Sequence, residues 1–138
     1  MNALRLLAAP AAALALTLGA APAAPAAPAT TTTTTATVLV VNDTIGPVQA
    51  HQGDTVQVEL TAWRDYTVTW YWYAVGTTAP AVLTQTAGSA DADGDAHGTF
   101  TAAAAGTSSI TAIGRCVPDR GAVCPPWVIN WNIPVTVS

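Results

Sequence analysis

Apolar and polar residues alternate along most of the chain after residue 36. Between Thr55 and Leu60 the sequence TVQVEL places an apolar side chain at every second position, and Gln57 and Glu59 fall between them. The segments 98–102 (GTFTA) and 129–137 (INWNIPVTV) alternate in the same way. Successive side chains of a β-strand point to opposite faces of its sheet. Each segment therefore predicts a strand with one buried and one exposed face.

Turn-forming residues divide this pattern into short segments. Pairs such as Gly53-Asp54 and Asp93-Gly94 are typical of turns, and no helical periodicity is present after residue 36. Seven short strands are typical of an immunoglobulin-like sandwich. We therefore predict an all-β fold, an immunoglobulin-like β-sandwich of about seven strands, with a small barrel as the alternative. The predicted strands span residues 37–44, 55–61, 66–75, 81–86, 98–103, 108–115 and 128–137.

The N-terminal part of the chain has a different composition. Arg5 precedes an apolar run from Leu6 to about Leu18, and small residues follow it. This order is typical of a secretory signal peptide, and the run is shorter than the ~20 residues that span a bilayer. An uncleaved anchor is the alternative. We predict a signal peptide at 1–29, a solvated Thr-rich linker at 30–36 and the β-sandwich domain at 37–138. The mature protein is expected to be secreted and to have no membrane span.

The charge of the chain limits the expected partners, and its cysteines indicate a disulfide. The chain has 8 acidic residues, 4 basic residues and no lysine, which gives a formal net charge of −4. Such a surface repels phosphates, so nucleic acid is not an expected partner. The two cysteines, Cys116 and Cys124, favour a disulfide in an exported chain. Pro118-Asp119-Arg120-Gly121 between them is typical of a turn. The bond is expected to constrain the loop between the last two strands.

Aromatic residues occur on both faces of the third predicted strand. In YTVTWYWYAV, Trp70 and Trp72 point to one face, and Tyr71 and Tyr73 point to the other. The tryptophans are expected to fill the core. The outward tyrosines, together with Asn130 and Asn132 of the last strand, form a candidate site for sugar stacking or for a protein contact. The alternative is that the tyrosines simply pack under the linker or border solvent.

Signals for metal binding and catalysis are weak. Asp91, Asp93 and Asp95 alternate as at the start of a calcium loop, and His97 follows. The position of Gly94 and the lack of a later glutamate do not fit that motif, so we interpret the segment as an acidic turn. No serine-hydrolase or zinc-protease motif is present. We therefore expect no enzyme, no cofactor and no metal.

Three segments together indicate a family. These are GDTVQVEL at 53–60, GTFTAAAAGTSSITA at 98–112 and the final IPVTV at 133–137. Their order resembles secreted bacterial immunoglobulin-like proteins and, more distantly, the chagasin family of cysteine-protease inhibitors. That resemblance implies three loops at one end of the sandwich, near 61–67, 88–98 and 115–127, which fit a protease cleft. It also implies that Arg115 occupies the place of the arginine in the third loop.

These observations favour a secreted, non-enzymatic protein-binding module. Its partner would be an extracellular protein, and a papain-like cysteine protease is the most specific version of this prediction. Tryptophan and arginine commonly anchor protein contacts. Two alternatives stay open, namely carbohydrate or cell-wall binding by the sheet face of Tyr71, Tyr73, Asn130 and Asn132, and a structural surface domain without a dedicated site. The predicted partner-binding residues are Trp63, Arg64, Arg115, Pro126 and Trp127.

Overall fold

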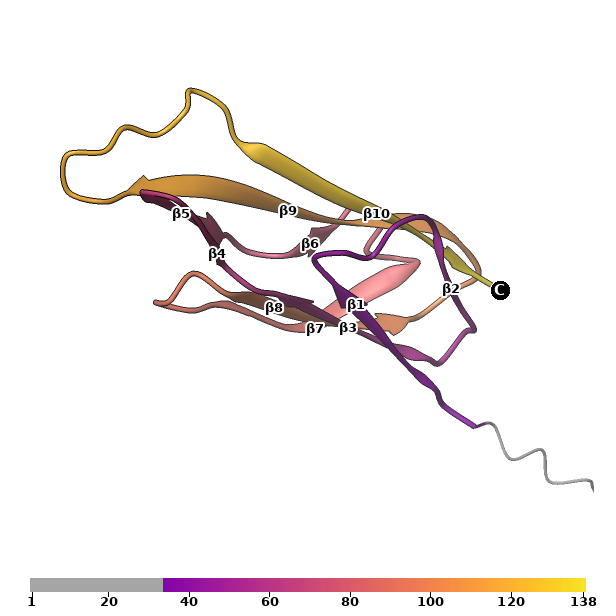
Figure 1. Ribbon diagram of the computed structural model, residues 1–138. Coiled ribbons are helices and arrows are strands. Elements are labelled where there is room, and N and C mark those ends of the chain that lie inside the picture. The colour runs from indigo at the N-terminus through magenta and orange to yellow at the C-terminus, as the bar shows by residue number, and fades with distance from the viewer. Residues whose placement is uncertain (1–33) are drawn as a thin grey trace, which may run out of the picture. The chain divides into compact units, whose positions relative to one another are not determined.

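The computed structural model describes residues 34–138 (Figure 1). The predicted signal peptide and residues 30–33 of the predicted linker lie outside the described residues. Residues 34–138 belong to one compact unit, and they contain ten strands and no helix. No helix in this part is therefore long and apolar enough to cross a bilayer. The strands are β1 (Thr37–Val41), β2 (Val48–Ala50), β3 (Thr55–Leu60), β4 (Trp63–Asp65), β5 (Val68–Trp72), β6 (Gly76–Thr77), β7 (Leu83–Ala90), β8 (Ala96–Ala102), β9 (Gly106–Pro118) and β10 (Ile129–Val137).

The strands form two sheets that face each other in a β-sandwich (Figure 1). One sheet has four strands in the order β1-β3-β8-β7. The other has six, in the order β2-β10-β9-β5-β4, with β6 paired to β9. Most neighbours are antiparallel, whereas β1 runs parallel to β3 and β2 runs parallel to β10. The all-β sandwich predicted from the sequence is confirmed.

The alternation in the sequence explains how the sheets pack. In β8 every second residue is buried, from Ala96 to Ala102, and in β3 the buried residues are Val56, Val58 and Leu60. These residues meet the inward side chains of the six-stranded sheet in one apolar core, and burying them supplies most of the driving force for folding. The largest fully buried side chains are Phe100, Leu60, Leu83, Ile110, Val40, Val56, Val58 and Val135.

The seven predicted strands correspond to the seven longer strands of the structure. The remaining three, β2, β4 and β6, have three residues or fewer, which is too short to give a visible alternation. Pro134 has no N–H to donate to a neighbouring strand, so a proline in a strand belongs at an edge or a bulge. It lies opposite Ser109 of β9, and β10 pairs with β2 only from Val135 onward. Pro134 therefore occupies a stretch of β10 that is paired on one side.

The tryptophans of β5 are buried, as the sequence predicted. Trp70 and Trp72 are both buried, and Trp72 belongs to the main core cluster. Trp63 of β4 lies on the same side of the sheet, because it is the cross-strand partner of Trp70. Its ring is stacked on that of Trp70 with a centroid separation of 5.9 Å. The Trp63 ring also contacts that of Trp72, which in turn contacts Trp131 of β10, so four of the five tryptophans form one aromatic cluster.

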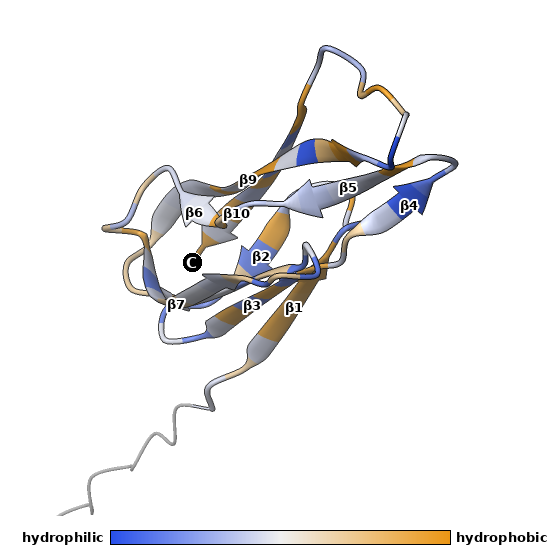
Figure 2. Ribbon diagram, turned by 90° about the vertical axis from the view of Figure 1, so that its left-hand side faces the viewer, coloured by the Kyte–Doolittle hydropathy of each residue, from blue (hydrophilic) through white to orange (hydrophobic). Residues whose placement is uncertain are grey.

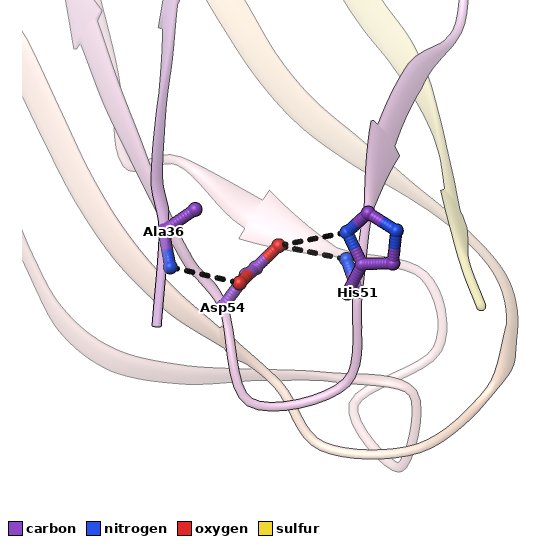
Figure 3. A network of polar contacts seen from close by, with 3 residues as sticks. All are labelled: Ala36, His51 and Asp54. Carbon is purple, nitrogen blue, oxygen red and sulfur yellow. Dashed lines mark hydrogen bonds and ion pairs between the residues drawn. The ribbon is translucent and has the colours of Figure 1, made fainter. Parts of the chain in front are cut away.

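A buried carboxylate, that of Asp54, binds the backbone just before β1 (Figure 3). Asp54 is only 4% exposed, and its two oxygens accept the backbone N–H groups of His51 at 2.8 Å and Ala36 at 2.9 Å. The His51 imidazole lies 3.6 Å from the same carboxylate. The His51 backbone N–H, and then that of Ala36, lower the pKa of Asp54 because they stabilise its charged form. Asp54 thereby connects the turn before β3 to the residue preceding β1.

Replacing Asp54 with asparagine is expected to lower the Tm by several degrees at pH 7. An amide can accept only one of the two N–H groups and presents its own N–H₂ to the other. Because the folded-state pKa of Asp54 is depressed, its contribution is complete above the ordinary pKa of about 4. That contribution is lost as the pH falls below this value. Thermal melts of both proteins from pH 7 to pH 2 should converge at the acid end, and a constant gap would contradict this explanation.

Candidate functional site

Three connections lie together at one end of the sandwich, on the left in Figure 1. They are the β4–β5 turn (residues 66–67), the β7–β8 turn (residues 91–95) and the β9–β10 loop (residues 119–128), and we call this region the loop end. The backbone N–H of Asp119 donates to the Thr67 carbonyl at 2.9 Å. The Arg64 guanidinium binds the Asp119 carboxylate with both terminal nitrogens. The first and third connections are therefore fastened to each other.

The β9–β10 loop contains the disulfide that the sequence predicted. Cys116, near the end of β9, is bonded to Cys124 with an S–S distance of 2.04 Å. Pro125 and Pro126 follow directly and restrict the backbone further. The loop projects beyond the strands and includes an apolar segment, seen in orange in Figure 2. A ring and two prolines thus hold an exposed apolar loop in few conformations.

Removing the disulfide should destabilise the protein and loosen this loop. Changing Cys116 and Cys124 to serine is expected to lower the free energy of unfolding by about 2–3 kcal/mol, because the unfolded chain regains the entropy of an open loop. Urea denaturation of the double variant beside the oxidised protein measures the difference. Reducing the unaltered protein with dithiothreitol should reproduce it. Equal stability of the oxidised and reduced proteins would contradict the prediction.

The β7–β8 turn is fixed against the edge of β5. The Gly94 carbonyl accepts the backbone N–H of Trp72 at 2.7 Å, and the Asp95 carboxylate accepts the N–H of Ala62 at 2.7 Å. Gly94 has φ of +96°, and a Cβ there would lie 2.5 Å from the Tyr71 ring. Only glycine allows this close approach. The turn therefore covers part of Tyr71.

Two of the three aspartates in the β7–β8 turn make contacts within the fold. Asp91 lies 3.2 Å from the His97 imidazole, and Asp95 is the acceptor for Ala62. Within residues 34–138 no group of three or more histidine, cysteine or acidic side chains is arranged to hold a metal ion. The geometry agrees with our interpretation of this segment as a turn between two strands.

Several large apolar side chains are exposed at the loop end, and three of them are exposed more than the others. Tyr66 is 93% exposed, Val123 is 88% exposed and Trp127 is 62% exposed. Tyr66 lies at the tip of the β4–β5 turn, and the other two lie in the β9–β10 loop. When a partner removes exposed aromatic and aliphatic side chains from water, the free energy of the complex becomes more favourable. The loop end therefore offers exposed apolar surface that a protein contact could bury.

The five predicted partner-binding residues separate into two groups. Arg64, Pro126 and Trp127 are exposed and belong to the loop end or pair with it. Trp63 is half-buried, because its ring packs against Trp70 and Trp72. Arg115 lies on the outer face of the six-stranded sheet, where its guanidinium carbon is 5.1 Å from the centre of the Tyr73 ring. The structure brings three of the five residues together.

The alternative sheet-face residues share one face, as the alternation predicted. Tyr71 is the cross-strand partner of Arg115, and Asn130 and Asn132 are exposed on the same side of β10. Tyr73 is also exposed, whereas Tyr71 is half-buried beside Gly94. A hollow of about 390 Å³ borders the two asparagines. Sugar binding by this face stays a prediction.

Tyr66 is a candidate residue that the sequence analysis did not identify. It has φ of +52°, which is unusual for a bulky residue and occurs in turns or at strained positions. The two-residue turn Tyr66-Thr67 contains no glycine, asparagine or aspartate, so composition gave no turn signal. A strained aromatic residue that makes few contacts within its own domain suggests a role in binding.

Substituting Tyr66 with glycine should stabilise the protein. Glycine adopts positive φ without a steric penalty, and the exposed ring contributes little packing. We expect the free energy of unfolding to rise by about 0.5–1 kcal/mol. Urea denaturation is the measurement. Tyr66→Ala, which keeps the Cβ, is the matched control and should give no gain. A loss of stability in the glycine variant would show that the ring makes stabilising contacts.

Comparison with known proteins rests on three-dimensional structure. No protein-family model matches the chain, and no curated protein matches it at a significant level. The crystal structure of the cysteine protease inhibitor EhICP2 from Entamoeba histolytica is similar, with a TM-score of 0.50 and 8% sequence identity, over 75% of this chain and 97% of that chain. The chain shares the fold of this inhibitor. At this identity the likeness establishes the fold and not the activity.

A second solved structure also resembles the chain. It is the solution structure of amebosin, with a TM-score of 0.41 and 12% identity, over 77% of this chain and 100% of amebosin. The match to EhICP2 covers nearly all of that protein, so this chain contains a domain of about its length.

Proposed function

We propose that the protein is a secreted binding module that recognises an extracellular protein through its loop end, without catalysis. The most specific form of this proposal is inhibition of a papain-like cysteine protease. The observation that carries it is the grouping of exposed Tyr66, Val123 and Trp127 on fastened loops. The fold shared with a cysteine protease inhibitor supports the same partner class.

The proposed binding depends on loops that are ordered before the partner arrives. Every loop and side chain that must be immobilised on association makes the free energy of binding less favourable. Here the Cys116–Cys124 bond and the bidentate contact between Arg64 and Asp119 restrict the β9–β10 loop in the free protein. The exposed aromatic rings can then fill a cleft at a small entropic cost. In a protease, a rigid loop end in the cleft would block access of substrate to the catalytic groups.

The proposal is tested with purified protein comprising residues 30–138. Papain and one related protease are assayed with a fluorogenic peptide substrate at increasing concentrations of the protein. We expect competitive inhibition with a Ki at or below about 1 μM, as for standard-sized interfaces. The reduced protein should inhibit less well, because its loop has more conformations. An absence of inhibition at tens of micromolar would reject the protease form of the proposal.

The broader form, protein binding by the loop end, has its own test. Immobilised protein is used to capture proteins from culture medium, beside a matched variant in which Tyr66, Val123 and Trp127 are alanine. Partners that bind the unaltered protein and not the triple variant support the proposal. Partners retained equally by both proteins would place the binding surface elsewhere.

A further inference from the structure

A cleft opens on one flank of the sandwich, where both sheets have a free edge. β1 is the last strand of the four-stranded sheet, and β10 has no β2 partner before Val135. A hollow of about 660 Å³ lies there, bordered by Trp63, Trp72 and Trp131 together with Asn42, Asp43 and Glu59. That volume is within the range of small-molecule sites. The loop-end proposal does not use this cleft.

The aromatic rings of the cleft are inclined to one another. The Trp63 and Trp72 rings are 5.4 Å apart with an interplanar angle of 50°. The Trp72 and Trp131 rings are 6.4 Å apart at 65°. Rings inclined in this way offer π-electron density from more than one direction. Such an arrangement attracts a cation, as in the aromatic cages that bind quaternary ammonium groups.

Most of the side-chain hydrogen-bond donors that line the cleft are already used by the protein. The indole N–H of Trp72 donates to the Thr61 carbonyl at 3.1 Å, and that of Trp131 donates to the Asn42 carbonyl at 3.4 Å. The Asn42 amide donates to the Thr61 carbonyl and accepts the Thr61 N–H, each at 2.7 Å. The polar side-chain groups of the lining that stay available are the Thr61 hydroxyl, the indole N–H of Trp63 and the carboxylates of Asp43 and Glu59.

The charges that line the cleft also favour a cation. Within residues 34–138 neither Asp43 nor Glu59 forms an ion pair, and no basic side chain lines the hollow. His97, the cross-strand partner of Glu59, contacts Asp91 at 3.2 Å. The site therefore offers negative charge and acceptors but few donors. A sugar requires both donors and acceptors, and an anion would be repelled, whereas a cation satisfies what is present.

We propose that this cleft binds a small organic cation that carries an alkylammonium group. The charged nitrogen lies among the rings of Trp63, Trp72 and Trp131, with the carboxylates of Asp43 and Glu59 beside it. The alkyl carbons contact the indole faces. The ligand is thus held both by electrostatic attraction and by contact with the apolar walls. A neutral sugar would lack the first interaction, and a metal ion would lack the second.

Choline and its neutral isostere 3,3-dimethyl-1-butanol distinguish this proposal from simple apolar binding. Each compound is titrated into the protein, and upfield shifts of its methyl protons and quenching of tryptophan fluorescence are measured. We expect choline to bind with a Kd of about 1 mM and the isostere at least about tenfold more weakly. Equal affinities, no binding of choline at about 50 mM, or preferential binding of glucose would overturn the proposal.

Variants locate the site. Asp43→Asn and Glu59→Gln should each weaken choline binding at least about threefold, and Trp131→Leu should do so about fivefold. Asp93→Asn, in the exposed β7–β8 turn, is the matched control and should bind choline as the unaltered protein does. Thermal melts of the two exposed carboxylate variants confirm that they stay folded. Unchanged affinity in both variants would overturn the proposal. These tests are independent of protease inhibition.

Discussion

Phe100→Ala should lower the free energy of unfolding by about 3–5 kcal/mol, because it leaves a large cavity at the centre of the core. Phe100 is 0% exposed and is the largest fully buried side chain. It lies in β8, between Val56 of β3 and Gln85 of β7. Paired strands on both sides prevent the backbone from closing the cavity. The loss is a large share of the roughly 5–15 kcal/mol that stabilises a domain of this size.

The change is measured by urea denaturation and by thermal melting, where the Tm should fall by about 15 °C or more. Phe100→Leu, which keeps most of the volume, should lose less than half as much. Thr101→Ala changes the next residue on the outer side of the same strand and serves as the control. A small effect of Phe100→Ala, close to that of Thr101→Ala, would show that the two sheets do not depend on this contact.

Trp127→Ala is expected to raise the Ki for a papain-like protease at least about 30-fold, if the loop end fills the cleft as proposed. The Trp127 ring is 62% exposed in the free protein, so binding would remove much apolar surface from water. It follows Pro125-Pro126 and the disulfide ring, which fix the position of its backbone. The thermal stability of the variant should remain close to that of the unaltered protein.

Leu39→Ala is the matched control for this substitution. Leu39 is similarly exposed, at 55%, but lies in β1 of the four-stranded sheet and away from the three loops. It should leave both Ki and Tm nearly unchanged. An unaltered Ki for Trp127→Ala, or equal losses for both variants, would show that inhibition does not depend on the loop end.

The alternation of apolar and polar residues was sufficient to predict the fold class. Segments such as 55–60 and 129–137 alternate because one sheet face is buried and the other meets water, so the pattern records burial directly. The short strand β4 could not be found in this way, because three residues do not establish a period. The parallel pairing of β1 with β3 also left no local signal, since it depends on the whole topology.

The site was predictable only in part, because the direction of a side chain in a strand depends on how that strand pairs with its neighbours. Cys124 and Trp127 lie in the β9–β10 loop and Cys116 lies near the end of β9, so their proximity in sequence was sufficient. Trp63 and Arg115 turned away from the loop end because strand pairing with Trp70 and Tyr71 fixes the face on which each lies. No property of a single segment indicates which strand will be its neighbour.

The Asp54 contact helps to fix the side of the domain on which the chain can be joined to another molecule or surface. Asp54 holds Ala36 at the start of the domain, and Gln52 nearby donates its N–H to the carbonyl of Ser138, the last residue. Both ends of the described chain therefore leave the sandwich on the side away from the loop end (Figure 1). A linker, a surface or a fused domain joined at either terminus would point the three loops outward, toward an approaching partner.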